Sequence, residues 1–324
     1  MNYSGLSSGI IAATAVPFHD DRSINWKELQ AYIAQVAEGN PKAIALNMAV
    51  GEVSSLSIDE QLQVIRRCRE VVGDRSVLLS GISATSTETA VDLAKKLAHV
   101  GAGGLVVFPP APAFLGQPTL EMIADYHGAI ADAVALPFFA FQTQHSTYPY
   151  GSIKTLSEIP NVVAVKDASF DVEQTLQNVE ERNSIGSKIG ILTGSDTFIL
   201  EAILMGCDGA LIGFAATATA ALVEMHNMVI AGKITEAYQI WCGLAPLARI
   251  CWRQPIRDYR VRMKYVLFKQ GILSNYLVRS PMPALSEKDK ADIDALFESS
   301  DLKNYTFHPS GHKRGSREQR VAGT

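Results

Sequence analysis

The sequence contains few cysteines, and their positions suit neither a disulfide framework nor a metal site. There are four in 324 residues, with no Cys-x-x-Cys pair and no spacing typical of zinc ligands. No group of His, Asp and Glu residues has the spacing of metal ligands either. We therefore expect reduced core cysteines in a cytoplasmic protein, and no metal ion. The cysteines are Cys68, Cys207, Cys242 and Cys251.

Long hydrophobic runs and a strong excess of charge are also missing. No stretch approaches the ~18 uninterrupted apolar residues of a membrane-spanning helix. The apolar N-terminal run has no basic region before it and is broken at Pro17, so we expect no signal peptide. The formal net charge of −4 argues against a nucleic-acid surface on the folded part. We therefore expect neither a membrane nor a nucleic acid as a partner, and we do not expect secretion.

A glycine-rich dinucleotide fingerprint is absent from the first turn, although short apolar segments alternate with helical patterns throughout. This alternation is typical of a (β/α)8 TIM barrel and also of a doubly wound open sheet. The missing fingerprint makes the open sheet the weaker alternative. The eight expected strands are residues 9–16, 42–47, 76–81, 103–108, 136–141, 161–165, 188–193 and 208–213.

We expect three regions along the chain. Residues 1–225 form the barrel, and residues 226–305 form a C-terminal helical region with apolar stripes. The tail, residues 306–324, is polar, basic and without a pattern, so we expect it to be disordered. Its basic residues are more typical of a solvated tail than of a nucleic-acid site.

Lys166 directly follows a valine-rich strand of the expected barrel. The active site of such a barrel lies at the carboxyl ends of its strands. Burial there lowers the pKa of an amine from about 10.4 toward the ~7–8 that suits a nucleophile. Such an amine can form a Schiff base with a ketone. The alternative is a lysine that ends a strand and extends to water. The neighbouring Asp167 either tunes this amine or caps the strand.

A second candidate segment follows the second expected strand. Backbone N–H groups of Ala49, Val50 and Gly51, just before Glu52, can point into the mouth of a barrel. N–H groups in such a turn can hold a substrate carboxylate.

Four segments together resemble the dihydrodipicolinate synthase and N-acetylneuraminate lyase family, the pyruvate-type class I aldolases. The resemblance extends over roughly residues 9–273, and the motifs occur in the order that the family has. They are Ala49–Glu52 with Leu56, Ser57 and Glu60, then Val165–Asp167, Leu192–Asp196 and Gly206–Gly213.

The resemblance implies a Schiff base on Lys166 and a homotetramer built as a dimer of dimers. It implies no cofactor, because the iminium withdraws electrons itself. It also places the substrate among residues of several strand ends. These expected contacts are Ala49, Val50, Gly51, Phe141, Gln142, Gly194 and Ile212.

The chain departs from the family where the family carries catalytic side chains. Ala49 and Val50 replace residues that usually bear hydroxyl groups, and Phe141 replaces the catalytic tyrosine. Residues 108–111 lack a second family tyrosine, and residues 145–146 lack the arginine that binds the second substrate's carboxylate. The departures predict that this chain does not make dihydrodipicolinate.

The loop after the fifth expected strand is rich in polar residues and offers a replacement for the missing tyrosine. His145 can exchange protons near neutral pH, with Gln142 as a polar partner. The alternative for His145 is a loop residue that faces water. We therefore expect a lyase, an aldolase or dehydratase, that acts on a 2-keto acid through Lys166. The competing interpretation is a catalytically silent relative that binds a small keto acid or serves in assembly.

Overall fold

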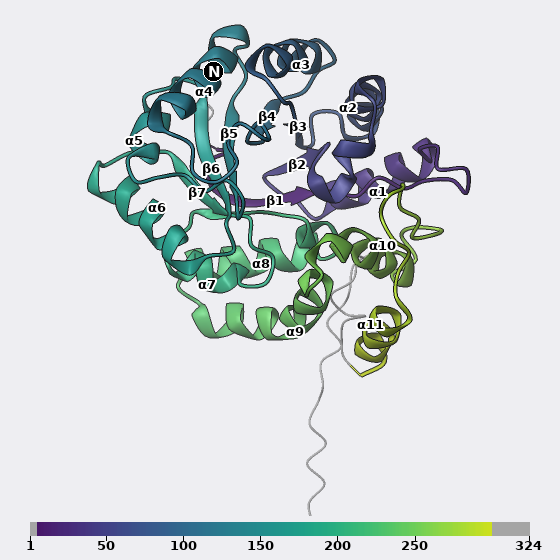
Figure 1. Cartoon of the computed structure of the whole chain (residues 1–324). Coiled ribbons are helices and arrows are strands. Elements are labelled where there is room, and N and C mark those ends of the chain that lie inside the picture. Colours follow the sequence, from purple (N-terminus) through teal and green to yellow (C-terminus); the bar gives the residue numbers. More distant parts are fainter. Residues whose placement is uncertain (1–4, 300–324) are drawn as a thin grey trace, which may run out of the picture.

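The computed structural model describes residues 5–299 and contains a closed barrel of parallel strands (Figure 1). Neighbours in the chain are neighbours in the barrel, and β8 pairs with β1 to close it. The predicted TIM barrel is thereby confirmed. The strands are β1 (Gly9–Ala13), β2 (Ala43–Leu46), β3 (Val77–Ile82), β4 (Gly104–Val107), β5 (Phe138–Thr143), β6 (Val162–Ala168), β7 (Gly190–Thr193) and β8 (Gly209–Ile212).

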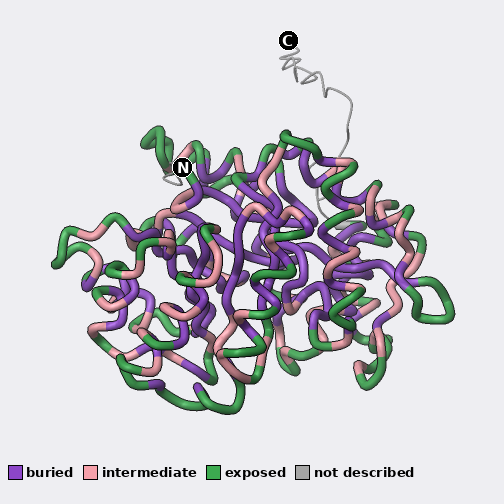
Figure 2. Tube along the Cα trace, turned by 90° about the horizontal axis from the view of Figure 1, so that it is seen from above, coloured by how far each residue is buried: buried purple, intermediate pink, exposed green. Residues whose placement is uncertain are grey.

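A helix follows each strand and packs on the outside of the barrel. Figure 2 shows buried residues in the interior of the molecule and exposed ones around its periphery. In α1, residues Leu29, Ile33 and Val36 are fully buried at helical spacing, as their pattern predicts. The helices are α1 (Trp26–Glu38), α2 (Ile58–Val72), α3 (Thr87–His99), α4 (Leu120–Ala133), α5 (Ser152–Ser157), α6 (Val172–Ser184), α7 (Ile199–Leu204) and α8 (Thr219–Ile230).

Strand β6 is longer than its sequence suggested. The apolar run predicts an end at Val165, but the ladder with β5 continues through Asp167 and Ala168. Lys166 therefore lies within the strand, where it pairs with Phe141 of β5 and Leu192 of β7.

The side chain of Asp167 points away from that of Lys166, as alternation along a strand requires. It is fully buried, and its carboxylate accepts hydrogen bonds from the Thr175 hydroxyl at 2.7 Å and from the Ser169 N–H at 2.9 Å. This geometry favours the capping alternative for Asp167, because the carboxylate fixes the connection from β6 to α6.

The C-terminal region begins after α8 and packs beside the barrel (Figure 1). The predicted division at residues 225 and 226 falls inside α8, so we propose that the barrel unit ends at Ile230. The predicted disordered tail, residues 306–324, lies outside the described residues. The region contains α9 (Ile234–Trp252), the short helix η4 (Ile256–Asp258), α10 (Tyr259–Lys269) and α11 (Glu287–Ser299).

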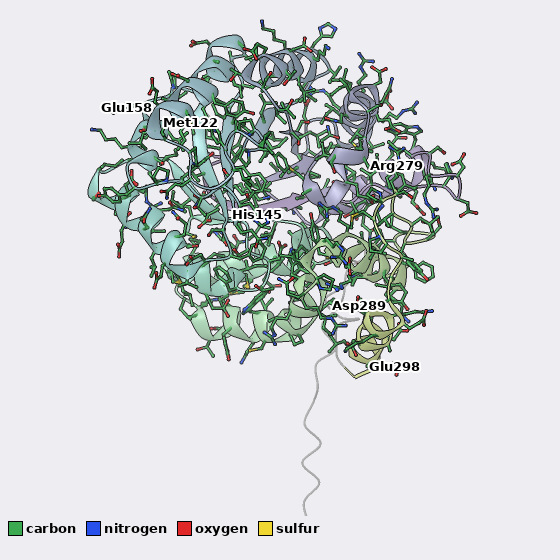
Figure 3. The ribbon with its side chains drawn as sticks, in the orientation of Figure 1. Met122, His145, Glu158, Arg279, Asp289 and Glu298 are labelled. Carbon is green, nitrogen blue, oxygen red and sulfur yellow. The ribbon has the colours of Figure 1, made fainter. Side chains whose placement is uncertain are left out.

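Ion pairs join the C-terminal region to the loop after β2. The ammonium of Lys264 lies 2.5 Å from Glu52, and both side chains are almost completely buried. Arg279 forms two hydrogen bonds to the carboxylate of Glu60, at 2.8 and 2.6 Å. Figure 3 places Arg279 at the side of the barrel and His145 near its centre.

Three of the cysteines are buried as expected, but Cys242 is exposed on α9. This corrects the prediction that all four are core residues, since Cys242 lies on the outer face of its helix. Among residues 5–299, no helix is both long enough and apolar enough to cross a membrane.

Candidate active site

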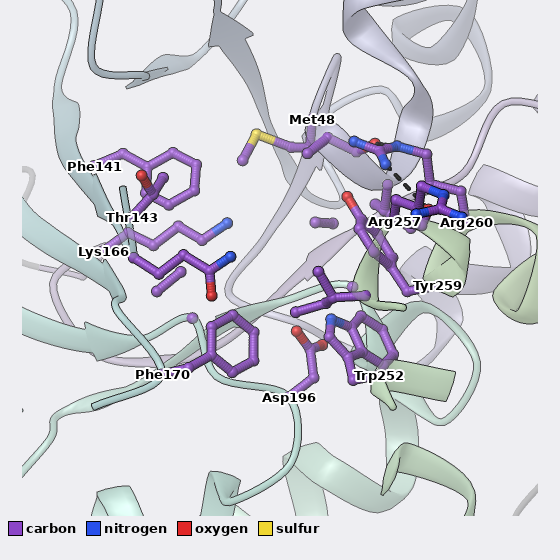
Figure 4. A pocket seen from close by; sticks show the side chains of 18 of the residues that line it. Met48, Phe141, Thr143, Lys166, Phe170, Asp196, Trp252, Arg257, Tyr259 and Arg260 are labelled. Atoms are coloured by element: carbon purple, nitrogen blue, oxygen red, sulfur yellow. Dashed lines mark hydrogen bonds between the residues drawn. The ribbon is translucent and has the colours of Figure 1, made fainter. Parts of the chain in front are cut away.

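A cavity of about 360 Å³ opens at the carboxyl ends of the barrel strands. Its walls come from β5, β6, the loops after β2, β7 and β8, and the C-terminal region (Figure 4). This is the end of the barrel at which TIM-barrel enzymes bind their substrates. Six of the nine predicted site residues line it. They are Ala49, Val50, Phe141, His145, Lys166 and Gly194.

Lys166 extends from β6 into this cavity and is 7% exposed. Its ammonium nitrogen lies 4.1 Å from the centre of the Phe141 ring. Gly194 leaves room for the lysine chain, because a Cβ atom at this position would lie 2.9 Å from Lys166 Cε. Burial lowers the pKa of Lys166 to about 8, against the opposing effect of the nearby Asp196 carboxylate. Near physiological pH the neutral fraction of this amine is therefore far larger than that of an ordinary exposed lysine.

Asp196 is the carboxyl group that faces the same cavity. It follows β7 by three residues, is 4% exposed and accepts a hydrogen bond from the Phe214 N–H at 2.7 Å. Burial raises the pKa of Asp196 to about 7, and the Phe214 N–H and the charge of Lys166 oppose this rise. An amine and a carboxyl group with these two acidities can exchange a proton near neutral pH.

The turn after β2 forms a short helix, η1 (Ala49–Gly51), at the cavity wall. Among residues 5–299, the N–H groups of Ala49 and Val50 have no hydrogen-bond partner. Gly51 does not line the cavity: its N–H donates to Met48 O at 2.9 Å, and a Cβ atom at this position would lie 2.8 Å from Thr14 O. Of the three N–H groups predicted to hold a carboxylate, those of Ala49 and Val50 therefore remain available.

Gln142 does not line the cavity either. Because Phe141 points inward, the next residue of the strand points outward. Gln142 is fully buried there, and its side-chain oxygen accepts the Tyr148 N–H at 2.7 Å. Thr143 faces the cavity instead, and the exposed His145 lies at the rim with its Nε2 atom 3.0 Å from Gln144 Nε2.

Ile212 is the third predicted contact that the structure places elsewhere. It is buried in β8, where it pairs with Ala12 of β1. The next residue, Gly213, lines the cavity and lets Trp252 approach, because a Cβ atom on Gly213 would lie 3.1 Å from Trp252 Cζ2.

One side of the cavity is built by a segment that the sequence did not single out. We call it the C-terminal wall: Trp252, Ile256, Arg257, Tyr259 and Arg260. The rings of Trp252 and Tyr259 stack with centres 5.3 Å apart and 16° between their planes. The Arg260 guanidinium carbon lies 4.7 Å from the centre of the Tyr259 ring, and Arg260 Nε donates to Ala49 O at 2.7 Å. These contacts hold the wall against η1.

The sequence model of the dihydrodipicolinate synthetase family matches residues 6–300. The chain belongs to this family. The resemblance seen in the sequence is thereby confirmed, and with it the assignment to a family of class I aldolase-type lyases.

Similar curated proteins of the family are named 4-hydroxy-tetrahydrodipicolinate synthase. One from Cellvibrio japonicus is 28% identical over 298 residues, which cover 91% of this chain and 99% of that protein. One from Streptococcus uberis is 30% identical over 237 residues, which cover 71% of this chain and 74% of that protein.

Solved structures of the family superimpose closely on this chain. The dihydrodipicolinate synthase of Acinetobacter baumannii, determined with pyruvate, has a TM-score of 0.80 and 27% identity, and the match covers 90% of this chain and 98% of that one. The enzyme from Thermotoga maritima has a TM-score of 0.82 and 20% identity over 91% of this chain and 99% of that one, a likeness of fold alone.

Sequence reasoning missed Asp196 and the C-terminal wall. The sequence did point to Asp196, because this residue ends one of the matched family motifs shortly after β7, but no role was assigned to it. No sequence pattern pointed to the C-terminal wall. Its residues lie far along the chain from Lys166 and reach the cavity only because η4 and α10 pack against η1.

Proposed function

We propose that this chain is a Schiff-base-forming lyase, an aldolase or dehydratase, that acts on a 2-keto acid through Lys166. The observation that carries the proposal is a buried lysine with a lowered pKa, which projects from a barrel strand into a cavity. Membership of the family and the pyruvate in the Acinetobacter baumannii structure support a small keto acid as substrate.

In the proposed reaction, the neutral amine of Lys166 attacks the ketone carbon. The ketone oxygen takes one proton from the amine and one from Asp196, and it leaves as water. The resulting iminium withdraws electrons from the neighbouring carbon, so that a bond there can break or form without a cofactor. The N–H groups of Ala49 and Val50 are proposed to hold the substrate carboxylate.

Asp196 is also proposed to transfer the protons that a tyrosine at position 141 would otherwise transfer. Phe141 has no ionisable proton, whereas Asp196 is buried in the same cavity with a raised pKa. His145 remains a second candidate from its position at the rim. Its exposure makes it less suited to a step from which water must be kept away.

The expectation that the chain does not make dihydrodipicolinate receives no support from its curated relatives, which carry the synthase name. We keep it as a proposal on the strength of Phe141, Ala49 and Val50, which lack the hydroxyl groups of the family relay. Each such group typically contributes ~10²–10⁴-fold to the rate. In a coupled assay with pyruvate and aspartate semialdehyde, we expect turnover well below ~1 s⁻¹, and a rate at or above this value contradicts the proposal.

The missing phenol also favours the competing interpretation, a catalytically silent relative that binds a keto acid or serves in assembly. Borohydride trapping tests the lyase proposal against it. Treatment with pyruvate and borohydride should add a stable mass to the peptide that contains Lys166, and Lys166→Met should abolish the addition.

Lys264 provides an internal control for this experiment. Its pKa is also lowered to about 8 by burial, but it is paired with Glu52 and does not line the cavity. Labelling of Lys264 in place of Lys166, or no labelling by any keto acid tried, contradicts the Schiff-base proposal.

The homotetramer and the cytoplasmic location stay predictions that rest on the resemblance and on composition. Light scattering of the full chain distinguishes a tetramer from a monomer, the state named for one solved structure of the same fold.

A further inference from the structure

The C-terminal wall gives the cavity a positive side opposite Lys166 (Figure 4). Arg257 and Arg260 both line it, and the phenol of Tyr259 lies between them in the sequence. Among the described residues around the cavity, Asp196 is the only Asp or Glu. The wall thus presents two cations and a hydroxyl donor without a carboxylate of its own.

Arg260 differs from the other half-buried or buried arginines of the C-terminal region. Arg253 and Arg262 pair with Asp289, and Arg279 pairs with Glu60. Arg260 forms no ion pair with any residue between 5 and 299. A half-buried guanidinium without a carboxylate partner is energetically unfavourable, because its charge has lost part of its hydration and no anion compensates for this loss.

The guanidinium of Arg260 is also held in place. Its Nε donates to Ala49 O at 2.7 Å and its Nη1 to Arg257 O at 3.3 Å, while Nη2 has no partner in the described part of the chain. Contact with the Tyr259 ring fixes the plane of the group. Arginine held in this way recognises planar anions such as carboxylates. Arg257 is 66% exposed at the same rim and only loosely paired, with Nε 3.5 Å from Asp258 Oδ1.

We propose that the C-terminal wall binds a second carboxylate of the substrate, at the end distant from the keto group. The substrate class is then a dicarboxylic 2-keto acid, joined to Lys166 at one end of the cavity and to Arg260 and Arg257 at the other. This inference rests on the proposed function, because the imine at Lys166 fixes the orientation of the substrate.

The test compares three keto acids that differ at the far end: pyruvate, 2-oxopentanoate and 2-oxoglutarate. The last two have the same number of carbons, and only 2-oxoglutarate carries the second carboxylate. The measured quantity is the concentration that gives half-maximal trapping on Lys166 with cyanoborohydride, read by mass spectrometry of the intact full-length protein. Wild type should need less 2-oxoglutarate than 2-oxopentanoate.

Arg260→Gln should raise the half-maximal concentration for 2-oxoglutarate by about tenfold or more, as the loss of a charge-assisted hydrogen bond requires. Loss of the Arg260–Ala49 contact acts on all three keto acids alike, so the preference for 2-oxoglutarate over 2-oxopentanoate should fall by about tenfold. Arg257→Gln, at an exposed position that does not endanger folding, should act in the same direction with a smaller effect. Arg66→Gln, an exposed arginine on α2 outside the cavity, is the matched control and should change none of the three.

An equal loss for all three keto acids in Arg260→Gln overturns the inference, because the preference for the second carboxylate is then independent of the arginine. Unchanged trapping of 2-oxoglutarate in both variants overturns it as well. If wild type forms no adduct on Lys166 with any of the three, the proposed function fails together with the inference. Adduct formation without dependence on the arginines refutes the inference alone.

Discussion

At the level of single residues, the notable feature is a lysine and a carboxyl group buried in one cavity. Burial disfavours the charged form of each, so it lowers the pKa of Lys166 and raises that of Asp196. Their mutual attraction opposes both shifts, since it favours the ion pair. The net result is an amine that can be neutral and a carboxyl group that can hold a proton at nearly the same pH, which is what imine formation requires.

The first residue-level prediction concerns pH. The amine reacts only in its neutral form, so the initial rate of Lys166 acetylation by acetic anhydride, a reaction that needs no proton from Asp196, should rise about tenfold per pH unit below a pKa of about 8 and level off above it. An unshifted lysine, with a pKa near 10.4, would continue to accelerate up to about pH 10. Rates measured between about pH 6 and pH 10 distinguish the two profiles.

Asp196→Asn serves as the companion variant in this measurement. The Asp196 carboxylate raises the pKa of Lys166, so its removal should move the inflection of the profile to lower pH. An inflection that does not move indicates that the two groups do not interact.

At the level of elements, the sequence predicted the fold well because the signals for helices and strands are local. Ser57 and Glu60 form a capping box at the start of α2, a pattern of a Ser followed three residues later by a Glu, with both reciprocal hydrogen bonds present. All eight strands occur where apolar runs were found. The predicted end of β6 at Val165 was wrong for a physical reason. Asp167 and Ala168 belong to the strand because they pair with β5, and pairing with another strand cannot be recognised from the local composition.

The site was predicted less completely than the elements. Residues on one strand alternate between the two faces of the sheet, so Phe141 and Gln142 cannot both face the cavity, a constraint that the predicted set of substrate contacts did not apply. Residues from the C-terminal region reach the cavity through tertiary contacts such as that of Arg260 with Ala49. A single sequence contains no local pattern for a contact between segments so far apart.

At the level of the whole molecule, the barrel and the C-terminal region both line the cavity that contains Lys166. Glu52 follows η1 directly and adopts a left-handed conformation with φ of 57°. Its carboxylate binds Lys264 of α10 at 2.5 Å and accepts the Arg279 N–H at 2.9 Å. The same contacts therefore position the turn that carries Ala49 and fasten α10, which supplies Tyr259 and Arg260 to the cavity.

The stability of the protein should depend strongly on this buried pair. Lys264→Met leaves the Glu52 carboxylate buried without its cation, and removal of one partner of a buried pair typically costs about 3–5 kcal/mol. The matched control is Lys96→Met, which breaks the exposed pair of Lys96 with Asp92 on α3, at side-chain exposures of 49% and 63%. That change should cost at most about 1 kcal/mol.

Urea unfolding of both variants, with the free energy of unfolding extrapolated to water, measures the difference. The double variant Glu52→Gln with Lys264→Met should recover part of the loss, because it removes the unpaired charge as well. Since Glu52 also orients η1, the single variant Lys264→Met should in addition weaken the trapping of pyruvate on Lys166. A loss no larger than that of Lys96→Met, with trapping unchanged, would mean that the C-terminal region does not depend on this pair for its attachment to the barrel.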